Sequence, residues 1–272
     1  MLYLVATPIG NLGDFSPRAR QILEQADVVA CEDTRTSRQL FLLLGIHVKK
    51  TIAYHDFNEE KAVPKMIEQL KSGVEMALVS DAGMPLISDP GYKLVRACRE
   101  QGIEVTSVPG ANAVLTALQL SGLPTDSFYF GGFLSAKKSQ REKTLSDVAD
   151  LSCTLIFYET AKRLSETLKS IEKTLGNRDM AVVRELTKKF EQVQTGDVSK
   201  LMDYYNEKGA PKGEIVLVIQ GAKETQKVGQ KDVSIKQLRS FLSAKDTAQV
   251  LSLIQNISKK EAYAQVLAHD KL

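Results

Sequence analysis

The stretch Leu78–Val95 reads LVSDAGMPLISDPGYKLV and decides the architecture predicted for the chain. Its first residues end the apolar run Met76–Val79, which predicts a buried strand, and apolar residues at helical spacing resume at Tyr92. Between them, residues 80–91 hold two glycines, two prolines and two aspartates. Glycine permits backbone angles that other residues avoid, while proline disfavours helix at the residue before it. Such a rigid loop after a parallel strand is typical of ligand sites in open α/β sheets, although an ordinary turn is the alternative.

Length and composition limit the class of protein. The chain has 272 residues, which is enough for two domains, and its 43% hydrophobic and 25% charged residues are typical of a soluble globular protein. No apolar run reaches the roughly 18 residues of a membrane span, and the apolar N-terminus resembles a strand, not a secretion signal. Three widely separated cysteines predict neither a disulfide framework nor a zinc site. We therefore expect a cytoplasmic protein with no membrane partner.

Strands and helices alternate through residues 1–121, which predicts an α/β domain with a mostly parallel sheet covered on both faces. Ser121–Thr125 is the expected hinge, and residues 122–221 predict a second α/β domain. Because two apolar runs adjoin there without an intervening helix, the second sheet is expected to be mixed. The adjacent glycines at 131 and 132 are predicted to form a turn. The expected strands of the first domain are Leu2–Ala6, Asp27–Cys31, Thr51–Tyr54, Met76–Val79 and Ile103–Val108.

The segment 222–272 differs from the rest. Nine of its residues are Lys or Arg and five are Asp or Glu, whereas the preceding residues hold 27 and 28. A polar linker is predicted over residues 221–229, followed by a helical face with Leu238, Phe241 and Leu242. Two further helices joined by a turn at Asn256 outline a helix-turn-helix in which Lys259 and Lys260 meet nucleic acid. A helical cap on the second domain is the alternative.

Several chemistries are not indicated. The sequence has no GxGxxG after its first strand, no P-loop motif and no GxSxG elbow, and its three histidines lack metal-ligand spacing. What remains is a set of loops at the ends of predicted parallel strands, at Pro8–Gly10, Asp81–Pro85 and Pro109–Asn112. We expect these loops to open on one crevice that suits a flat, polar, uncharged ligand.

The runs TPIGNLGD, EDTR, HDFN, SDAGMPLISDPG, VPGANAVLTALQLSGLP, GGFL, IFYE and GEIVLVI occur in this order. In this respect the chain resembles the tetrapyrrole methylase superfamily, and within it the members that modify ribosomal RNA. The resemblance implies a two-domain α/β fold, a homodimer, and S-adenosyl-L-methionine held in the cleft between the domains. It further implies methylation of the 2′-hydroxyl of a cytidine in the decoding region of small-subunit (16S) rRNA, with an assembled 30S particle as partner.

The resemblance also implies where the methyl donor binds. Met84 stands where the family usually has threonine, so its backbone is the expected contact. The residues expected to bind the donor are Pro8, Gly10, Ala82, Gly83, Met84, Pro85, Asn112, Ala113, Tyr158, Arg184 and Gly213.

A sulfonium methyl is already activated, so transfer requires alignment with the attacking hydroxyl and no metal. A ribose hydroxyl is a poor nucleophile, so a base or a cation would assist it. The candidates are Asp33, Arg35, His55, Asp81 and Glu185, each of which has a structural alternative such as helix capping for Asp33. The basic residues Lys137, Lys138, Arg141 and Lys143 are predicted to contact rRNA phosphates, with a solvated helix face as the alternative.

Two other functions remain open at this point. A precorrin-type enzyme would share the donor site but methylate carbon in a small macrocycle, and would need neither the basic run after the hinge nor the basic tail. A ligand-sensing DNA-binding protein would use the tail as its DNA-binding module. A single crevice between two adjacent domains favours the enzyme.

Overall fold

The computed structural model describes residues 1–209, 211–223, 235–255 and 257–269. The chain forms two compact units, Met1–Gly221 and Ala222–Leu272. Most of the predicted linker, and Asn256 of the predicted turn, lie outside the described residues. Within the described ranges, no helix has the length and apolar character to cross a membrane.

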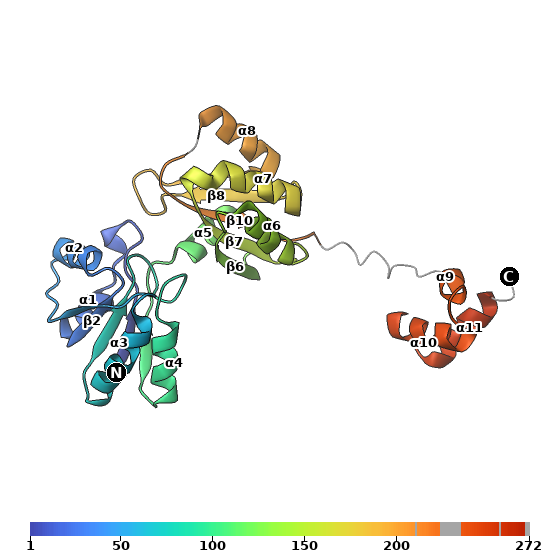
Figure 1. The fold of residues 1–272 in the computed structure, drawn as a ribbon. Coiled ribbons are helices and arrows are strands. Elements are labelled where there is room, and N and C mark those ends of the chain that lie inside the picture. The colour runs from blue at the N-terminus through green and yellow to red at the C-terminus, as the bar shows by residue number, and fades with distance from the viewer. Residues whose placement is uncertain (210, 224–234, 256, 270–272) are drawn as a thin grey trace. The chain divides into compact units, whose positions relative to one another are not determined.

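The first sheet consists of five parallel strands in the order β3-β2-β4-β1-β5. Figure 1 draws it in blue to green, with the helices α1 to α4 around it. Leu2 pairs with Met76 on one side and with Val105 on the other, so β1 lies between β4 and β5. The loops that follow these three parallel strands therefore leave the sheet side by side. The predicted parallel sheet is therefore confirmed. Its strands are β1 (Leu2–Val5), β2 (Val28–Cys31), β3 (Thr51–Ala53), β4 (Met76–Val79) and β5 (Val105–Val108).

Helices cover both faces of this sheet, as expected for parallel strands. Leu23 of α1 (Pro17–Gln25) and Phe41 of α2 (Thr34–Leu44) pack with Val29 on one face. On the other face, apolar residues of α3 (Glu59–Lys71) and α4 (Tyr92–Glu100) pack with Leu78.

Local sequence explains the helix ends. The hydroxyl of Ser16 accepts a hydrogen bond from the Ala19 N–H, and Pro17 occupies the first helical position of α1, as predicted. Gly45 ends α2 with a left-handed φ of 62°. A short 3-10 helix, η1 (Leu12–Asp14), precedes α1.

The second sheet is mixed, as predicted, with the strand order β6-β7-β10-β8-β9. Strand β6 is parallel to β7, and the other neighbours are antiparallel. The predicted turn at Gly131–Gly132 is wrong, because both residues lie inside β6. Gly132 has a φ of +64° there, and the register shifts between Phe130 and Phe133. The strands are β6 (Phe128–Phe133), β7 (Thr154–Thr160), β8 (Asp179–Arg184), β9 (Gln192–Asp197) and β10 (Glu214–Ile219).

One face of this second sheet is covered by α6 (Lys138–Asp147), α7 (Leu164–Leu175) and α8 (Val198–Lys208), with η2 (Ala161–Arg163) leading into α7. The other face packs on α5 (Ala113–Ser121) through Val114, Ala117 and Leu118. Helix α5 follows the last strand of the first sheet, yet its apolar side chains serve the second. The loop between β5 and α5 therefore passes from one sheet to the other.

The unit Ala222–Leu272 contains α9 (Ile235–Arg239), α10 (Ala244–Gln255) and α11 (Lys259–His269). Its core is formed by Ala248, Leu251, Ala262 and Val266. Ser258 caps α11 with its hydroxyl, and its own N–H donates to the Glu261 carboxylate. The prediction that Phe241 shares a helical face with Leu238 is wrong, because α9 ends at Arg239 and Phe241 is 88% exposed.

Candidate active site

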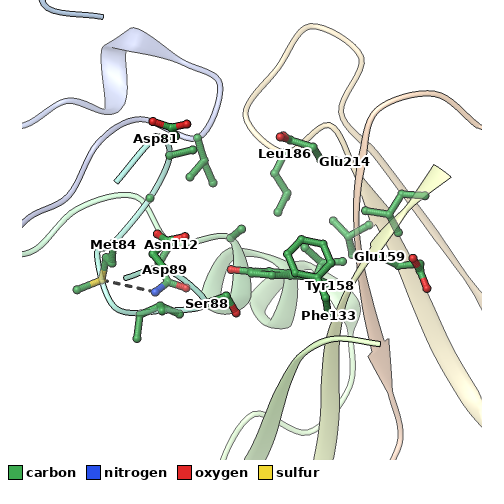
Figure 2. Close-up of a pocket in the computed structure, with 18 of the residues that line it drawn as sticks. Asp81, Met84, Ser88, Asp89, Asn112, Phe133, Tyr158, Glu159, Leu186 and Glu214 are labelled. Carbon is green, nitrogen blue, oxygen red and sulfur yellow. Dashed lines mark hydrogen bonds between the residues drawn. The ribbon is translucent and has the colours of Figure 1, made fainter. Parts of the chain in front are cut away.

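A cavity of about 430 Å³ lies between the loops of the first sheet and the strands of the second (Figure 2). One wall comes from the loops that follow β1, β4 and β5, as the sequence predicted, and from Glu32 after β2, which it did not. The other comes from β6, β7, the segment after β8 and the start of β10. The lining residues are Ile9, Glu32, Asp81–Met84, Ile87–Asp89, Asn112, Ala113, Phe133, Tyr158–Thr160, Val183, Leu186 and Gly213–Val216.

Backbone hydrogen bonds fix the loop after β4. The Thr7 N–H donates to the Gly83 carbonyl at 2.8 Å, and the Gly83 N–H donates back to the Thr7 carbonyl at 3.1 Å. Gly83 has a left-handed φ of +80°, and a Cβ there would lie 3.3 Å from Ile9 Cγ2. Leu86 and Ser88 also have positive φ, at 72° and 67°. Such backbone is costly without glycine, so this loop is held in its shape by its surroundings.

Asn112 joins this loop to the one after β5. Its side-chain oxygen caps α5 by accepting from the Leu115 N–H at 3.0 Å. Its amide nitrogen lies 3.5 Å from the Met84 sulfur, as the dashed line in Figure 2 marks. Asn112 thus contacts both the start of α5 and the Met84 side chain of the loop after β4.

Acidic groups dominate the charge of the cavity. Glu32, Asp81, Asp89, Glu159 and Glu214 line it, and among the described residues that line it there is no Lys, Arg or His. Burial, reinforced by the carboxylates of Glu32 and Asp81, raises the pKa of Asp89 to about 6. Burial likewise raises the pKa of Glu32, with Asp81 adding to the effect. A cationic ligand would relieve this mutual repulsion.

Hydrogen bonds hold these carboxylates in place. The Asp81 N–H donates to Glu32 Oε2 at 3.3 Å, and Asp81 Oδ1 accepts from the Asp33 N–H at 3.2 Å. The loops after β2 and β4 are thereby cross-linked.

Aromatic and aliphatic groups form the opposite wall. The Tyr158 ring lies 5.2 Å from that of Phe133 and 4.9 Å from that of Phe130, centroid to centroid. Burial, with a contribution from Asp89, raises the pKa of Tyr158 to about 12, so its hydroxyl keeps its proton. Val183, Leu186 and Val216 add apolar surface. The cavity therefore has the carboxylates of Glu32, Asp81 and Asp89 on the wall from the first sheet, and aromatic rings on the wall from the second, where Glu159 and Glu214 are paired with Arg163 and Lys188.

The structure brings most of the predicted donor residues to this cavity. Ala82, Gly83, Met84, Asn112, Ala113, Tyr158 and Gly213 line it. Pro8, Gly10, Pro85 and Arg184 do not; their chain neighbours Ile9, Met84 and Val183 take those places. The Arg184 side chain instead donates to Gln192 Oε1 at 2.8 Å and to the Lys212 carbonyl at 3.2 Å.

Of the five predicted catalytic residues, only Asp81 lines the cavity. Asp33 binds the Arg35 guanidinium at 2.8 Å and caps α2, which is the structural alternative. Glu185 pairs with Lys188 at 3.1 Å. His55 also lies outside the lining, because its loop follows β3 at the edge of the sheet.

Sequence reasoning missed several lining residues. Glu32 and Asp89 belong to the runs EDTR and SDPG, so their place after a strand was a usable signal. Phe133, Glu159 and Glu214 come from the second sheet and lie in the runs GGFL, IFYE and GEIVLVI, which were a usable signal as well. Among the described residues, no group of three or more His, Cys, Asp or Glu is placed to hold a metal ion.

The predicted RNA-contacting residues divide into two groups. Lys137, Lys138 and Lys143 at α6 are exposed, as are Lys259 and Lys260 at the start of α11. Arg141 is a correction, since it is only 3% exposed. Its guanidinium donates to the Ser170 hydroxyl and to the carbonyls of Ser135, Ala136 and Glu166. It therefore fastens α6 to α7 and is not available to a phosphate.

Curated relatives match this chain over most of its length. Proteins called ribosomal RNA small subunit methyltransferase I are 42% identical in Vibrio cholerae, covering 97% of this chain and 93% of the relative, and 40% identical in Escherichia coli O157:H7, covering 98% and 94%. The protein of that name from Mesorhizobium japonicum is 50% identical, covering 80% of this chain and 74% of the relative.

Solved structures share the fold at lower identity. Diphthine synthase has a TM-score of 0.64 at 15% identity, covering 81% of this chain and 89% of that one. Cobalt precorrin-4 methyltransferase has a TM-score of 0.58 at 19% identity, covering 80% and 93%. Residues 1–202 match the family model of the tetrapyrrole (corrin/porphyrin) methylases. The chain therefore belongs to the tetrapyrrole (corrin/porphyrin) methylase family.

Proposed function

We propose that this protein is an S-adenosyl-L-methionine-dependent methyltransferase that modifies the 2′-hydroxyl of a cytidine in the decoding region of small-subunit (16S) rRNA. The observation that carries the proposal is the extent of the match to relatives called ribosomal RNA small subunit methyltransferase I. At 42% identity it covers 97% of the chain, and so includes residues of both compact units. The precorrin methyltransferase is similar at 19% identity. This likeness supports a shared fold and carries no argument about the substrate.

The cavity suits the methyl donor in size and chemistry. Its volume of about 430 Å³ is within the range of small-molecule sites. Gly83 leaves open the space that a Cβ would take beside Ile9. Tyr158 and Phe133 offer aromatic surface to an adenine. The carboxylates of Asp81 and Asp89 line the same cavity and would stabilise the positive charge of a sulfonium. Tyr158 and Phe133 would hold the base, while Ala82–Met84 and Asn112 would hold the methionine portion.

When bound, S-adenosyl-L-methionine supplies a methyl group that its sulfonium has already activated. The task left to the protein is alignment, which contributes on the order of 7–11 kcal/mol in well-oriented reactions. Asp81 and Asp89 are the carboxylates best placed to accept the proton of the attacking hydroxyl. A pKa of about 6 keeps Asp89 ionised at neutral pH while leaving it basic enough to take a proton. The apolar residues Val183 and Leu186 line the same cavity and would disfavour water there.

For the rRNA, the exposed lysines 137, 138 and 143 of the first unit and 259 and 260 of the second provide positive charge. Contacts from such side chains to phosphates would give affinity that falls with salt. We include an assembled 30S particle as substrate, a homodimer and a cytoplasmic location in the proposal. Sedimentation of the purified protein at micromolar concentration tests the dimer.

The proposal is tested with purified protein, labelled methyl donor, and 30S particles or free rRNA from cells that lack the gene. Mapping 2′-O-methylation by primer extension at low nucleotide concentration should reveal one new stop in the decoding region. The Asp81→Asn and Asp89→Asn variants should lower the rate at saturating rRNA. Transfer of label to a precorrin but not to any rRNA would refute the proposal in favour of small-molecule methylation.

A further inference from the structure

A second pocket, of about 360 Å³, lies on the first unit outside the donor cavity. Phe190, Tyr204 and Tyr205 give it aromatic surface, and Arg184, Lys208 and Lys212 give it positive charge. The two tyrosine rings are 5.0 Å apart and nearly perpendicular. Phe190 is 65% exposed. Aromatic rings beside cations are the combination with which proteins bind single-stranded nucleic acid without reading its sequence.

The buried hydroxyl of Tyr205 is a second, independent observation that points to a ligand at this pocket. Its side chain lines the pocket and is only 5% exposed, yet among the described residues no partner bonds its hydroxyl. A buried hydroxyl without a partner is rare, because it loses its bonds to water on burial. The adjacent Tyr204 differs, since its hydroxyl accepts from Gln192 Nε2 at 3.1 Å. The pocket therefore offers one unused polar group as well as aromatic surface.

The cationic side chains of this pocket have N–H groups available for a further hydrogen bond. Within the described part of the chain, Arg184 uses one N–H on Gln192 and one on the Lys212 carbonyl, out of the five that a guanidinium carries. Lys212 is exposed. Lys208 Nζ forms an ion pair with Glu207 Oε1 at 3.2 Å. Both side chains are largely exposed, and exposed ion pairs are weak. All three can therefore turn toward a phosphate.

Chain connectivity places this pocket next to the donor cavity. Glu185 lines the pocket and Leu186 lines the cavity, and Lys212 and Gly213 divide in the same way. Glu185 itself is neutralised by Lys188 at 3.1 Å, so it does not cancel the positive charge of the pocket. The segments 185–186 and 212–213 thus form the boundary between the pocket and the donor cavity. A strand of RNA with one nucleoside at the donor can reach the pocket with a neighbouring nucleotide.

We propose that this pocket binds a nucleotide flanking the methylated one, with the base against Tyr204 and Phe190 and its phosphate held by Arg184, Lys208 and Lys212. The inference rests on the proposed function, because it assigns a second contact to the same RNA substrate. The contact would be tolerant of base identity, since every base has a face that can stack. It would position the strand while the donor cavity performs the reaction.

The test measures binding of a fluorescent single-stranded RNA oligonucleotide by anisotropy, with the full-length protein. The first variant is Lys208→Ala/Lys212→Ala, and its matched control is Lys61→Ala/Lys65→Ala, which changes two exposed lysines on α3. We expect the first variant to weaken binding about tenfold or more, and to reduce the slope of log affinity against log salt by about 0.7 per lost phosphate contact. The control should bind as the unmodified protein does, and both should retain the same affinity for S-adenosyl-L-methionine.

The second variant, Tyr205→Phe, removes only the unpartnered hydroxyl. We expect thermal stability to be unchanged or higher, while RNA affinity falls about threefold to tenfold. RNA binding unchanged in both variants, or an equal loss in the α3 control, would overturn the inference. So would dissociation of the oligomer in the variants, which would identify a second copy of the chain as the occupant.

The design separates this inference from the proposed function. If no rRNA is methylated but RNA binding still depends on Lys208, Lys212 and the Tyr205 hydroxyl, the pocket assignment stands and the proposed function fails. If rRNA is methylated and the variants show unchanged KM for RNA, the pocket assignment fails alone.

Discussion

Replacing Asp89 by asparagine should stabilise the protein and weaken its proposed chemistry at the same time. Asparagine has nearly the same shape as aspartate but carries no charge. Burial and the neighbouring carboxylates of Glu32, Asp81 and Asp56 raise the pKa of Asp89 to about 6. At neutral pH the folded protein therefore holds an ionised group where ionisation is unfavourable, and the amide removes that cost.

The direction with pH follows from linkage. Because the pKa of Asp89 is higher in the folded than in the unfolded protein, the folded state binds the proton more tightly. This contribution favours folding at low pH and is lost as pH rises from about 4 to about 6. A shift of this size corresponds to about 3 kcal/mol, which solvent screening of the partly exposed side chain reduces to about 1–2 kcal/mol. The Asp89→Asn variant should gain that amount at pH 8 and almost nothing at pH 4.

Urea denaturation of the two proteins at pH 4, 6 and 8 measures the difference. Calorimetry at pH 8 should show the affinity for S-adenosyl-L-methionine lowered by about 1 kcal/mol, because one carboxylate facing a cation is gone. Asp126→Asn, at an exposed position, is the matched control and should change neither quantity. A stability gain of equal size at all three pH values, or a destabilised variant at pH 8, would refute this reasoning.

Three further changes test other parts of the structure. Gly83→Ala should reduce donor affinity more than tenfold, since it adds roughly 1–2 kcal/mol of left-handed strain and a Cβ 3.3 Å from Ile9; calorimetry against Gly102→Ala, which has φ +68° but no atom near its Cβ, isolates the cavity effect. Arg141→Ala should lower the free energy of unfolding by about 2–4 kcal/mol and leave the RNA affinity of the folded fraction unchanged, which denaturation and anisotropy measure. Tyr54→Phe should cost about 1.5–3 kcal/mol in urea denaturation, because the buried hydroxyl donates to the Glu59 carboxylate at 2.7 Å; a cost near zero would contradict that bond.

The acidic lining of the cavity bears on its choice of ligand. The glycine- and proline-rich loops at the strand ends predicted a flat, polar, uncharged ligand, since such loops offer mainly backbone groups. The structure instead gathers five carboxylates around the cavity. Glu159 and Glu214 are paired with Arg163 and Lys188, while burial is the main cause that raises the pKa values of Glu32, Asp81 and Asp89. A site of this charge favours a ligand with a positive centre, and disfavours one that has lost it. Loss of charge from the donor on methyl transfer would thus weaken its hold.

The local pattern of the sequence was enough for most of the elements and for the parallel character of the first sheet. Apolar runs bounded by glycine and proline, and caps such as Ser16 and Gly45, depend on neighbours in the chain, so they can be read without the fold. The same holds for the loop at Gly83, because a strand followed by glycine and proline leads to the carboxyl edge of a parallel sheet.

Only the tertiary structure decided which side chains meet. The sequence predicted Arg141 as an exposed cation beside the lysines, but the packing of α6 on α7 buries it, with hydrogen bonds to the Ser170 hydroxyl and the Glu166 carbonyl. Glu32, Asp89 and Glu214 come together from three separate segments, and within the described ranges the buried Tyr205 hydroxyl has no hydrogen-bond partner. Periodicity and capping act over a few residues, whereas burial and charge proximity arise from contacts between segments that are distant in sequence, and these determine the chemistry of the cavity and the pocket.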